Sequence, residues 1–130
     1  MIEQILSFFS YFVAACVLLA LFVLLYVHIT PYREFALIRA GNLSACLALL
    51  GAVAGFSLPL ASAIAHSVSL PDMLLWALLA MAAQALVYLL IDRILPDIPR
   101  GIGEGVPAHG ALLGGLSVCV GLINAACITY

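Results

Sequence analysis

Charged residues are scarce in this sequence. Four basic and six acidic side chains make up 8% of its 130 residues, whereas a soluble domain has about 25%. So few charges cannot cover a water-facing surface, and 67% of the residues are hydrophobic, which excludes an ordinary soluble fold. Runs rich in lysine or arginine are also absent, so we expect no nucleic-acid partner.

Catalytic and cofactor motifs are missing as well. The sequence has no GxSxG, HExxH, P-loop or CxxC pattern. Segment 100–105 is glycine-rich but lacks the βαβ context of a nucleotide site, so we interpret it as a flexible turn. His28, Asp92 and His109 are metal ligands by type, but no ligand spacing links them. We therefore expect a non-enzymatic protein without a metal or cofactor.

The sequence does contain four long apolar runs, at residues 7–28, 43–65, 72–91 and 106–128. Each has the roughly 20 residues needed to cross a bilayer, and each must be helical there, because only a helix satisfies its own backbone polar groups in lipid. The first run follows an acid and no base, so it is predicted to be a retained span rather than a secretion signal. The sequence predicts an all-α transmembrane domain over 1–130.

All four arginines lie in two of the three connections between these runs. Arg33 and Arg39 are in the first connection, and Arg93 and Arg100 are in the third. The positive-inside rule places these two connections in the cytoplasm. Both termini are then predicted to lie on the outer side of the membrane.

The two halves of the chain share this pattern. In 7–65 and again in 72–128, an arginine-bearing connection joins two apolar runs, and Gly41 aligns with Gly105 at an offset of 64 residues. Each half has two spans, so both halves insert the same way up. The pattern predicts two parallel two-helix repeats related by an axis along the membrane normal.

Small residues predict which helices are central. Close approach of helices in lipid depends on them, and the GxxxG motif is one such pattern. The second and fourth spans each contain one, at Gly51 with Gly55 and at Gly110 with Gly114. We expect these two spans at the centre and the bulkier first and third outside, with the glycine faces also offering a surface for a homo-oligomer.

Pro59 lies inside the second span. It cannot donate a hydrogen bond to the Gly55 carbonyl. We expect a kink here, with the hydroxyl of Ser57 or Ser62 compensating for the lost bond.

Two amides, Gln84 and Asn124, lie within spans. Either can hydrogen-bond between helices or contact a substrate or ion, and the sequence leaves both interpretations open.

The cytoplasmic rim gathers most of the remaining polar groups. They can mark the membrane boundary, bind lipid headgroups or dock a cytoplasmic protein. The candidate residues for a partner or lipid are Arg33, Glu34, Arg39, Asn42, Arg93 and Arg100.

Segments 38–45 and 121–129 resemble the YjfL family of small bacterial inner-membrane proteins, a family classed as a domain of unknown function. The resemblance covers nearly the whole chain. It implies a bacterial inner membrane, a duplicated two-helix unit and a loose association with envelope stress, but no activity. In such a membrane the outward termini predicted from the arginines are periplasmic. At Val106 the second half departs from the Gly-Asn pattern of Gly41 and Asn42.

Two functional hypotheses follow. The first is an accessory or scaffold protein that engages a partner or lipid at its cytoplasmic face. The second is a small oligomeric channel or uncoupled transporter, supported by the repeat, Pro59, Gln84 and Asn124.

Overall fold

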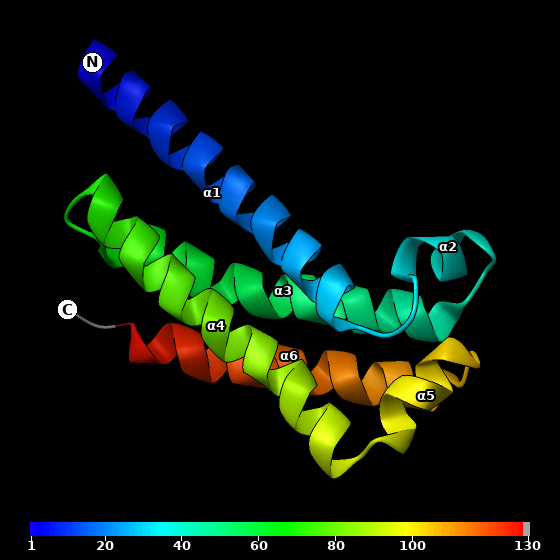
Figure 1. Cartoon of the computed structure of the whole chain (residues 1–130). Helices are drawn as coiled ribbons and strands as arrows, with labels where there is room; N and C mark the ends of the chain where they lie inside the picture. Colours follow the sequence, from blue (N-terminus) through cyan, green and yellow to red (C-terminus); the bar gives the residue numbers. More distant parts are fainter. Residues whose placement is uncertain (129–130) are drawn as a thin grey trace.

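The computed structural model describes residues 1–128. This part of the chain is all-helical, with a short helix between the first two long helices and another between the last two (Figure 1). The helices are α1 (Ile2–Ile29), α2 (Glu34–Arg39), α3 (Leu43–His66), α4 (Leu70–Ile94), α5 (Asp97–Gly103) and α6 (Pro107–Cys127).

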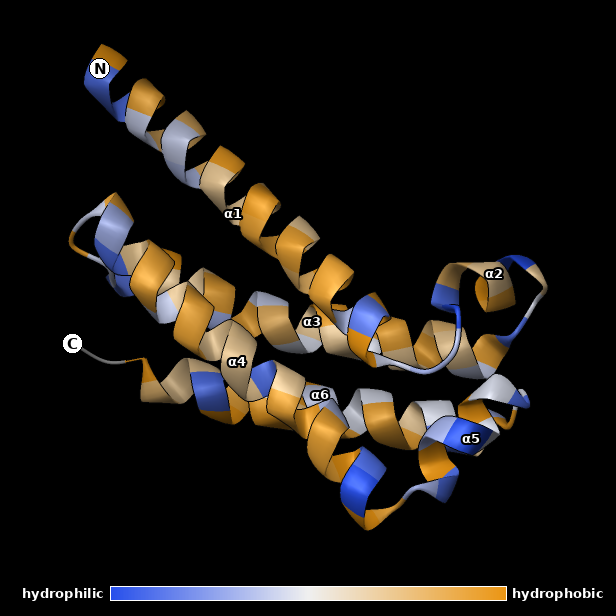
Figure 2. Ribbon diagram, viewed as in Figure 1, coloured by the Kyte–Doolittle hydropathy of each residue, from blue (hydrophilic) through white to orange (hydrophobic). Residues whose placement is uncertain are grey.

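Four of these helices, α1, α3, α4 and α6, are long and apolar enough to cross a bilayer, which confirms the predicted four spans. Figure 2 shows hydrophobic residues along these helices and most hydrophilic ones toward their ends. The helix α1 begins earlier than predicted, at Ile2. Glu3 and Gln4 are good helix formers, and an acid in the first turn complements the helix dipole.

Helices α3 and α6 pack against each other more extensively than any other pair. A methyl group on Gly51 would overlap the backbone of Gly114, and one on Gly110 would overlap the backbone of Ser44. Ser44 also accepts a hydrogen bond at its Oγ from the Gly110 backbone N–H, at 2.9 Å. Glycine therefore lets the backbones of α3 and α6 touch. The close approach also lets the Ser44 hydroxyl of α3 accept from a backbone N–H in the first turn of α6.

The glycine faces are thus occupied within one chain. Gly51, Gly55, Gly110 and Gly114 are all buried between α3 and α6. The partner helix fills these faces within one chain, and the expectation that they also serve a homo-oligomer stays a prediction.

Pro59 continues α3 without ending it. The expected compensation by serine is wrong: Ser57 Oγ donates to the Val53 carbonyl at 2.7 Å, and Ser62 Oγ donates to the Ala125 carbonyl of α6 at 2.9 Å. The Gly55 carbonyl instead faces Gly121, where any side chain would collide with it. A Cα–H of glycine can approach such a freed carbonyl as a weak donor.

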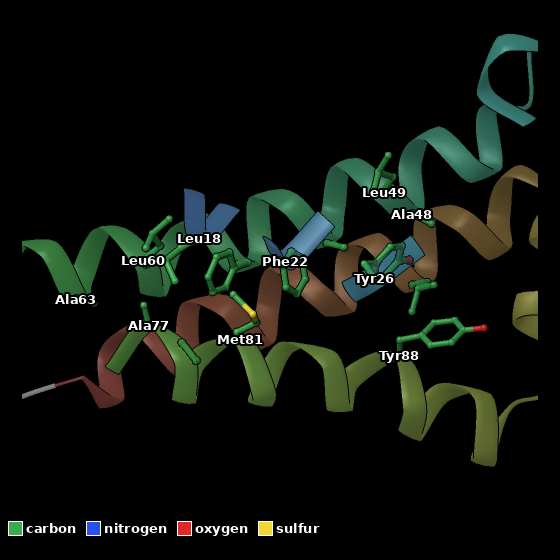
Figure 3. Packing of buried hydrophobic residues seen from close by; sticks show 14 of the residues in the cluster. Leu18, Phe22, Tyr26, Ala48, Leu49, Leu60, Ala63, Ala77, Met81 and Tyr88 are labelled. Carbon is green, nitrogen blue, oxygen red and sulfur yellow. The ribbon is translucent and has the colours of Figure 1, made fainter. Parts of the chain in front are cut away.

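The fully buried residues of helix α1 all lie in its second half, while Tyr11, Ala14 and Ala15 in the first half pack only partly against the core. Leu18, Phe22 and Tyr26, spaced four residues apart, are buried against the other helices. The Phe22 ring stacks on Phe56 of α3 with ring centroids 4.7 Å apart (Figure 3). Toward its N-terminus, α1 diverges from α3 (Figure 1), and the apolar residues there are exposed for lipid to cover.

The first and third connections each fold into a short helix, α2 and α5. The predicted flexible turn at 100–105 is wrong in its first part, because α5 extends to Gly103. Both short helices end at a glycine with positive φ, Gly41 at 90° and Gly105 at 84°. The bonds Asn42 N–H to Leu37 O and Val106 N–H to Gly101 O close the two turns in the same way.

Candidate functional site at the arginine-bearing end

The four arginines lie at one end of the bundle, on or beside α2 and α5 (Figure 1). All four side chains are exposed, and none is paired with an acid within residues 1–128. The start of α1, the end of α6 and the α3–α4 connection lie at the opposite end (Figure 1). The arginine-bearing end therefore presents four positive charges that the protein itself does not neutralise.

Glu34 does not belong to this exposed surface. It begins α2, yet its side chain is only 1% exposed. Its carboxyl accepts a hydrogen bond from the Thr30 hydroxyl, and no arginine pairs with it in the described chain. The expectation that Glu34 offers itself to a partner or lipid is wrong, because α2 turns its first residue inward against α1.

Three tyrosine hydroxyls accompany this carboxyl in the interior. The phenol oxygens of Tyr26, Tyr32 and Tyr88 are buried, and none makes a hydrogen bond with another described group. The rings of Tyr26 and Tyr88 meet edge to face with centroids 5.9 Å apart, and both point toward the α2 and α5 end (Figure 3). All three lie close enough to Glu34 for its charge to act on them. We call these four residues and Thr30 the Glu34 cluster.

Burial controls the protonation of the cluster members that lie outside the spans. It raises the pKa of the Glu34 carboxyl, while hydrogen bonds from Thr30 and from its own backbone oppose the change. It also raises the pKa of the Tyr32 phenol, and the nearby charges of Tyr26 and Glu34 add to the effect. Both groups are therefore held toward their neutral forms unless a positive charge joins them.

Asn42 forms hydrogen bonds with α3 in the first half of the chain and with α5 in the second half. Its side-chain oxygen caps α3 by accepting from the Ala45 backbone N–H at 3.0 Å, and its Nδ2 donates to the Ile102 carbonyl at 2.9 Å. Both ends of the amide are engaged within the chain. Asn42 thus fastens α5 to the start of α3, and less of it is free for the partner or lipid role predicted from the sequence.

The residues weighed as metal ligands do not meet. No group of three or more His, Cys, Asp or Glu side chains that could hold a metal occurs in the described residues. His28 is exposed, with its Nδ1 2.7 Å from the Leu24 carbonyl, and Asp92 is exposed on α4. The His109 ring packs directly on Gly101, where any side chain would displace it.

Gln84 and Asn124 are brought together. Gln84 is 4% exposed and donates from Nε2 to the Ser117 carbonyl of α6 at 3.1 Å. Asn124 Nδ2 donates to the Ala80 carbonyl at 3.2 Å and reaches Gln84 Oε1 at 3.4 Å. Every one of these bonds joins α4 to α6, so the two amides hold these helices together.

This pair predicts a measurable coupling. We expect Gln84→Leu and Asn124→Leu each to reduce the free energy of unfolding by about 1 kcal/mol, since hydrogen bonds between helices in lipid have about this strength. The double variant should lose about 0.5 kcal/mol less than the two single losses together, because the singles share one bond. Reversible unfolding in mixed micelles measures all three, and strict additivity would show that the amides act independently.

Comparison with known proteins agrees with the architecture. A family model described as Domain of Unknown Function (DUF350) matches residues 1–128. The chain belongs to this DUF350 family. It is 33% identical over 129 residues to proteins described as UPF0719 inner membrane protein YjfL from Escherichia coli K12 and from Escherichia coli O157:H7, covering 99% of this chain and 98% of each relative. No solved structure matches. This DUF350 chain is accordingly an integral inner-membrane protein with several spans.

Sequence reasoning missed the Glu34 cluster of this DUF350 protein. Tyr26, Tyr32 and Tyr88 resemble the aromatic residues that line a membrane boundary, and Thr30 carries no signal at all. What could have raised suspicion is the one acid that directly follows Arg33 in a short connection. Its burial depends on how α2 folds back, and no local pattern encodes that.

Proposed function

We propose that this protein is a non-enzymatic accessory protein of the bacterial inner membrane. It engages anionic lipid headgroups, or an acidic partner that competes for the same charges, at a cytoplasmic face formed by α2, α5 and their arginines. A role in envelope stress is consistent with the family resemblance. The observation that carries the proposal is the gathering of four exposed, unpaired arginines at one end of the bundle.

The physical basis is electrostatic. Each basic side chain near an anionic membrane surface contributes about 1 kcal/mol of attraction. Guanidinium groups also bind phosphate oxygens through two parallel hydrogen bonds. Four such groups on a small rim are enough for a preference for anionic lipid, and the two short helices fix their positions.

We further propose that the halves are parallel repeats related by an axis along the membrane normal. The support is the correspondence of their turns: each ends a short helix at a glycine with positive φ and passes into a long helix. Parallel repeats place both arginine-bearing connections on one side, which is what an electrostatic face requires.

Orientation is the first testable prediction. Reporter fusions after Ile128 and before Ile2 should be active on the periplasmic side, because the arginines hold the other end in the cytoplasm. A fusion within the first connection, after Arg39, should report the cytoplasm. A cytoplasmic C-terminus would contradict the proposed orientation and move the arginine face outside.

The second testable prediction is a preference for anionic lipids. Replacing all four arginines by glutamine should weaken the retention of phosphatidylglycerol and cardiolipin on the purified protein about tenfold or more, since about 1 kcal/mol is lost per charge. Native mass spectrometry of the protein released from micelles measures this retention. The matched control replaces the exposed His28 and His66 by glutamine and leaves all four arginines in place. Equal lipid retention by all variants would contradict the proposal.

A small oligomeric channel or uncoupled transporter is the second candidate. One observation favours it: the diverging first half of α1 leaves an apolar groove of about 380 Å³ beside α3, lined by Phe8, Tyr11 and Ile64 among others. A helix of another copy fits such a groove. Cross-linking in native-like lipid and ion flux in liposomes test it, and a monomer without flux would contradict it.

A further inference from the structure

The side-chain polar atoms of the Glu34 cluster are all oxygens. The Glu34 carboxyl accepts from the Thr30 hydroxyl, the three phenol oxygens are buried within range of its charge, and no arginine or histidine pairs with it in the described residues. The Thr30 Oγ also lies 3.4 Å from both the Val27 and Tyr32 carbonyl oxygens. Oxygen donors without nitrogen are the ligands that hard cations prefer.

Several oxygen atoms of the cluster have no partner or share one. The Thr30 hydroxyl has one proton for three neighbouring acceptors, which are the Glu34 carboxyl and the carbonyls of Val27 and Tyr32. The hydroxyl oxygens of Tyr26 and Tyr88, each on a side chain only 2% exposed, are buried without a partner at hydrogen-bond geometry. Buried polar atoms normally have partners, so these phenol oxygens leave lone pairs for a ligand.

The end of α1 adds to this negative character. The helix ends at Ile29, and Thr30 donates to two carbonyls of the last turn, from its N–H to Tyr26 and from its hydroxyl to Val27, so those of His28 and Ile29 have no helical donor. The dipole places partial negative charge there, and helix C-terminal ends coordinate sodium ions or protons in membrane transporters. Thr30, the residue that caps α1, lies at this point.

We propose that the Glu34 cluster is a binding site for a dehydrated monovalent inorganic cation, held by the Glu34 carboxylate, the Thr30 hydroxyl and the hydroxyls of Tyr26, Tyr32 and Tyr88. The site lies behind the arginine face and does not depend on the lipid or partner proposal.

The charge count selects a monovalent ion. One carboxylate neutralises one positive charge, and the described residues hold no group of three or more His, Cys, Asp or Glu side chains of the kind that binds a divalent ion. Asp92 acts on the Tyr88 hydroxyl from outside the cluster, but it is exposed on α4. The near-complete burial of Glu34 and Tyr26 leaves little space for a bulky organic ammonium.

A proton competes with the cation for the same carboxylate. The titratable groups that act on the cluster are Tyr26 on α1, Tyr32 in the first connection, and Tyr88 with Asp92 on α4. Because burial raises the pKa of Glu34, protonated Glu34 contributes stability at low pH that is lost as the pH rises through this pKa. Bound cation replaces that proton, so its effect on stability should grow with rising pH.

The test measures binding on the intact protein in detergent. Retention of radioactive sodium, with rubidium as a potassium analogue, is measured by scintillation proximity. Melting temperature is followed in sodium chloride and in choline chloride of equal ionic strength. We expect one of the two alkali ions to bind and to raise the melting temperature by roughly 5 °C at saturation. Glu34→Gln should abolish both responses.

Control variants separate the site from general effects. Glu104→Gln removes an exposed acid at the same end, and Tyr11→Phe removes a hydroxyl from the other half of α1; both should respond like the wild type. Tyr26→Phe and Tyr88→Phe keep the rings and the carboxylate, and should weaken cation affinity several-fold even if Glu34→Gln fails to fold. Three results would overturn the proposal. They are a melting temperature in choline chloride equal to that in sodium or potassium chloride, no binding of either ion by the wild type, and unchanged ion affinity in both tyrosine variants.

Discussion

Replacing Gly114 by isoleucine is expected to prevent α3 and α6 from packing. A Cβ at this position would collide with the Leu47 carbonyl on the facing helix. Because backbone atoms cannot rotate aside, the helices must separate, at a cost of about 3 kcal/mol or more. We expect little folded protein after detergent extraction, measured by size-exclusion chromatography and thermal melting.

The neighbouring residue provides the control. Gly115 has open space where its side chain would be, with nothing within 4 Å of the built Cβ. Gly115→Ile adds the same volume and hydrophobicity to the same helix, yet should change the melting temperature little. Similar behaviour of the two variants would show that α3 and α6 do not touch at Gly114.

Asn42→Ala should have the next largest effect. It removes the N-terminal cap of α3, of about 1 kcal/mol, and the hydrogen bond to Ile102 of α5, of about 1 kcal/mol. A loss of about 2 kcal/mol in the free energy of unfolding is expected from chemical denaturation in mixed micelles.

Asn42→Ser separates the two contributions. Serine caps a helix as well as asparagine does, but it is too short to reach the Ile102 carbonyl. It should recover about half of the stability lost by Asn42→Ala. If serine recovered all of it, the contact with α5 would contribute nothing to the fold.

The spans could be predicted because length and hydrophobicity alone determine them. A run such as 43–65 has one stable conformation in lipid, whatever its neighbours do. The close pairing of α3 with α6 was also accessible, because Gly51 and Gly114 allow two backbones to approach. The expectation that α6 is more central than α4 is wrong, because α4 contacts α1 as well as α3 and α6, and a larger share of α4 is buried.

The short helices and the Glu34 cluster were not accessible in the same way. Helices α2 and α5 have six and seven residues, too few for a periodic pattern, and helices this short depend on tertiary contacts for stability. Glu34 has an ionisable side chain, and the sequence therefore predicts that it is exposed. Its carboxyl is bonded to Thr30 and its charge reaches Tyr88, a residue far away in the sequence, so its burial depends on tertiary structure.

The pairing of α3 with α6 has a consequence for biosynthesis. Helix α3 is complete at His66, but its main partner begins only at Pro107. As the nascent chain leaves the ribosome, the glycine surface of α3 enters the bilayer with nothing to meet it, and lipid tails or an insertion chaperone must cover it for the interval. The pair of long helices α1 and α3 therefore lacks its main packing partner until α6 has been translated. A chain truncated before α6 should be degraded by membrane proteases.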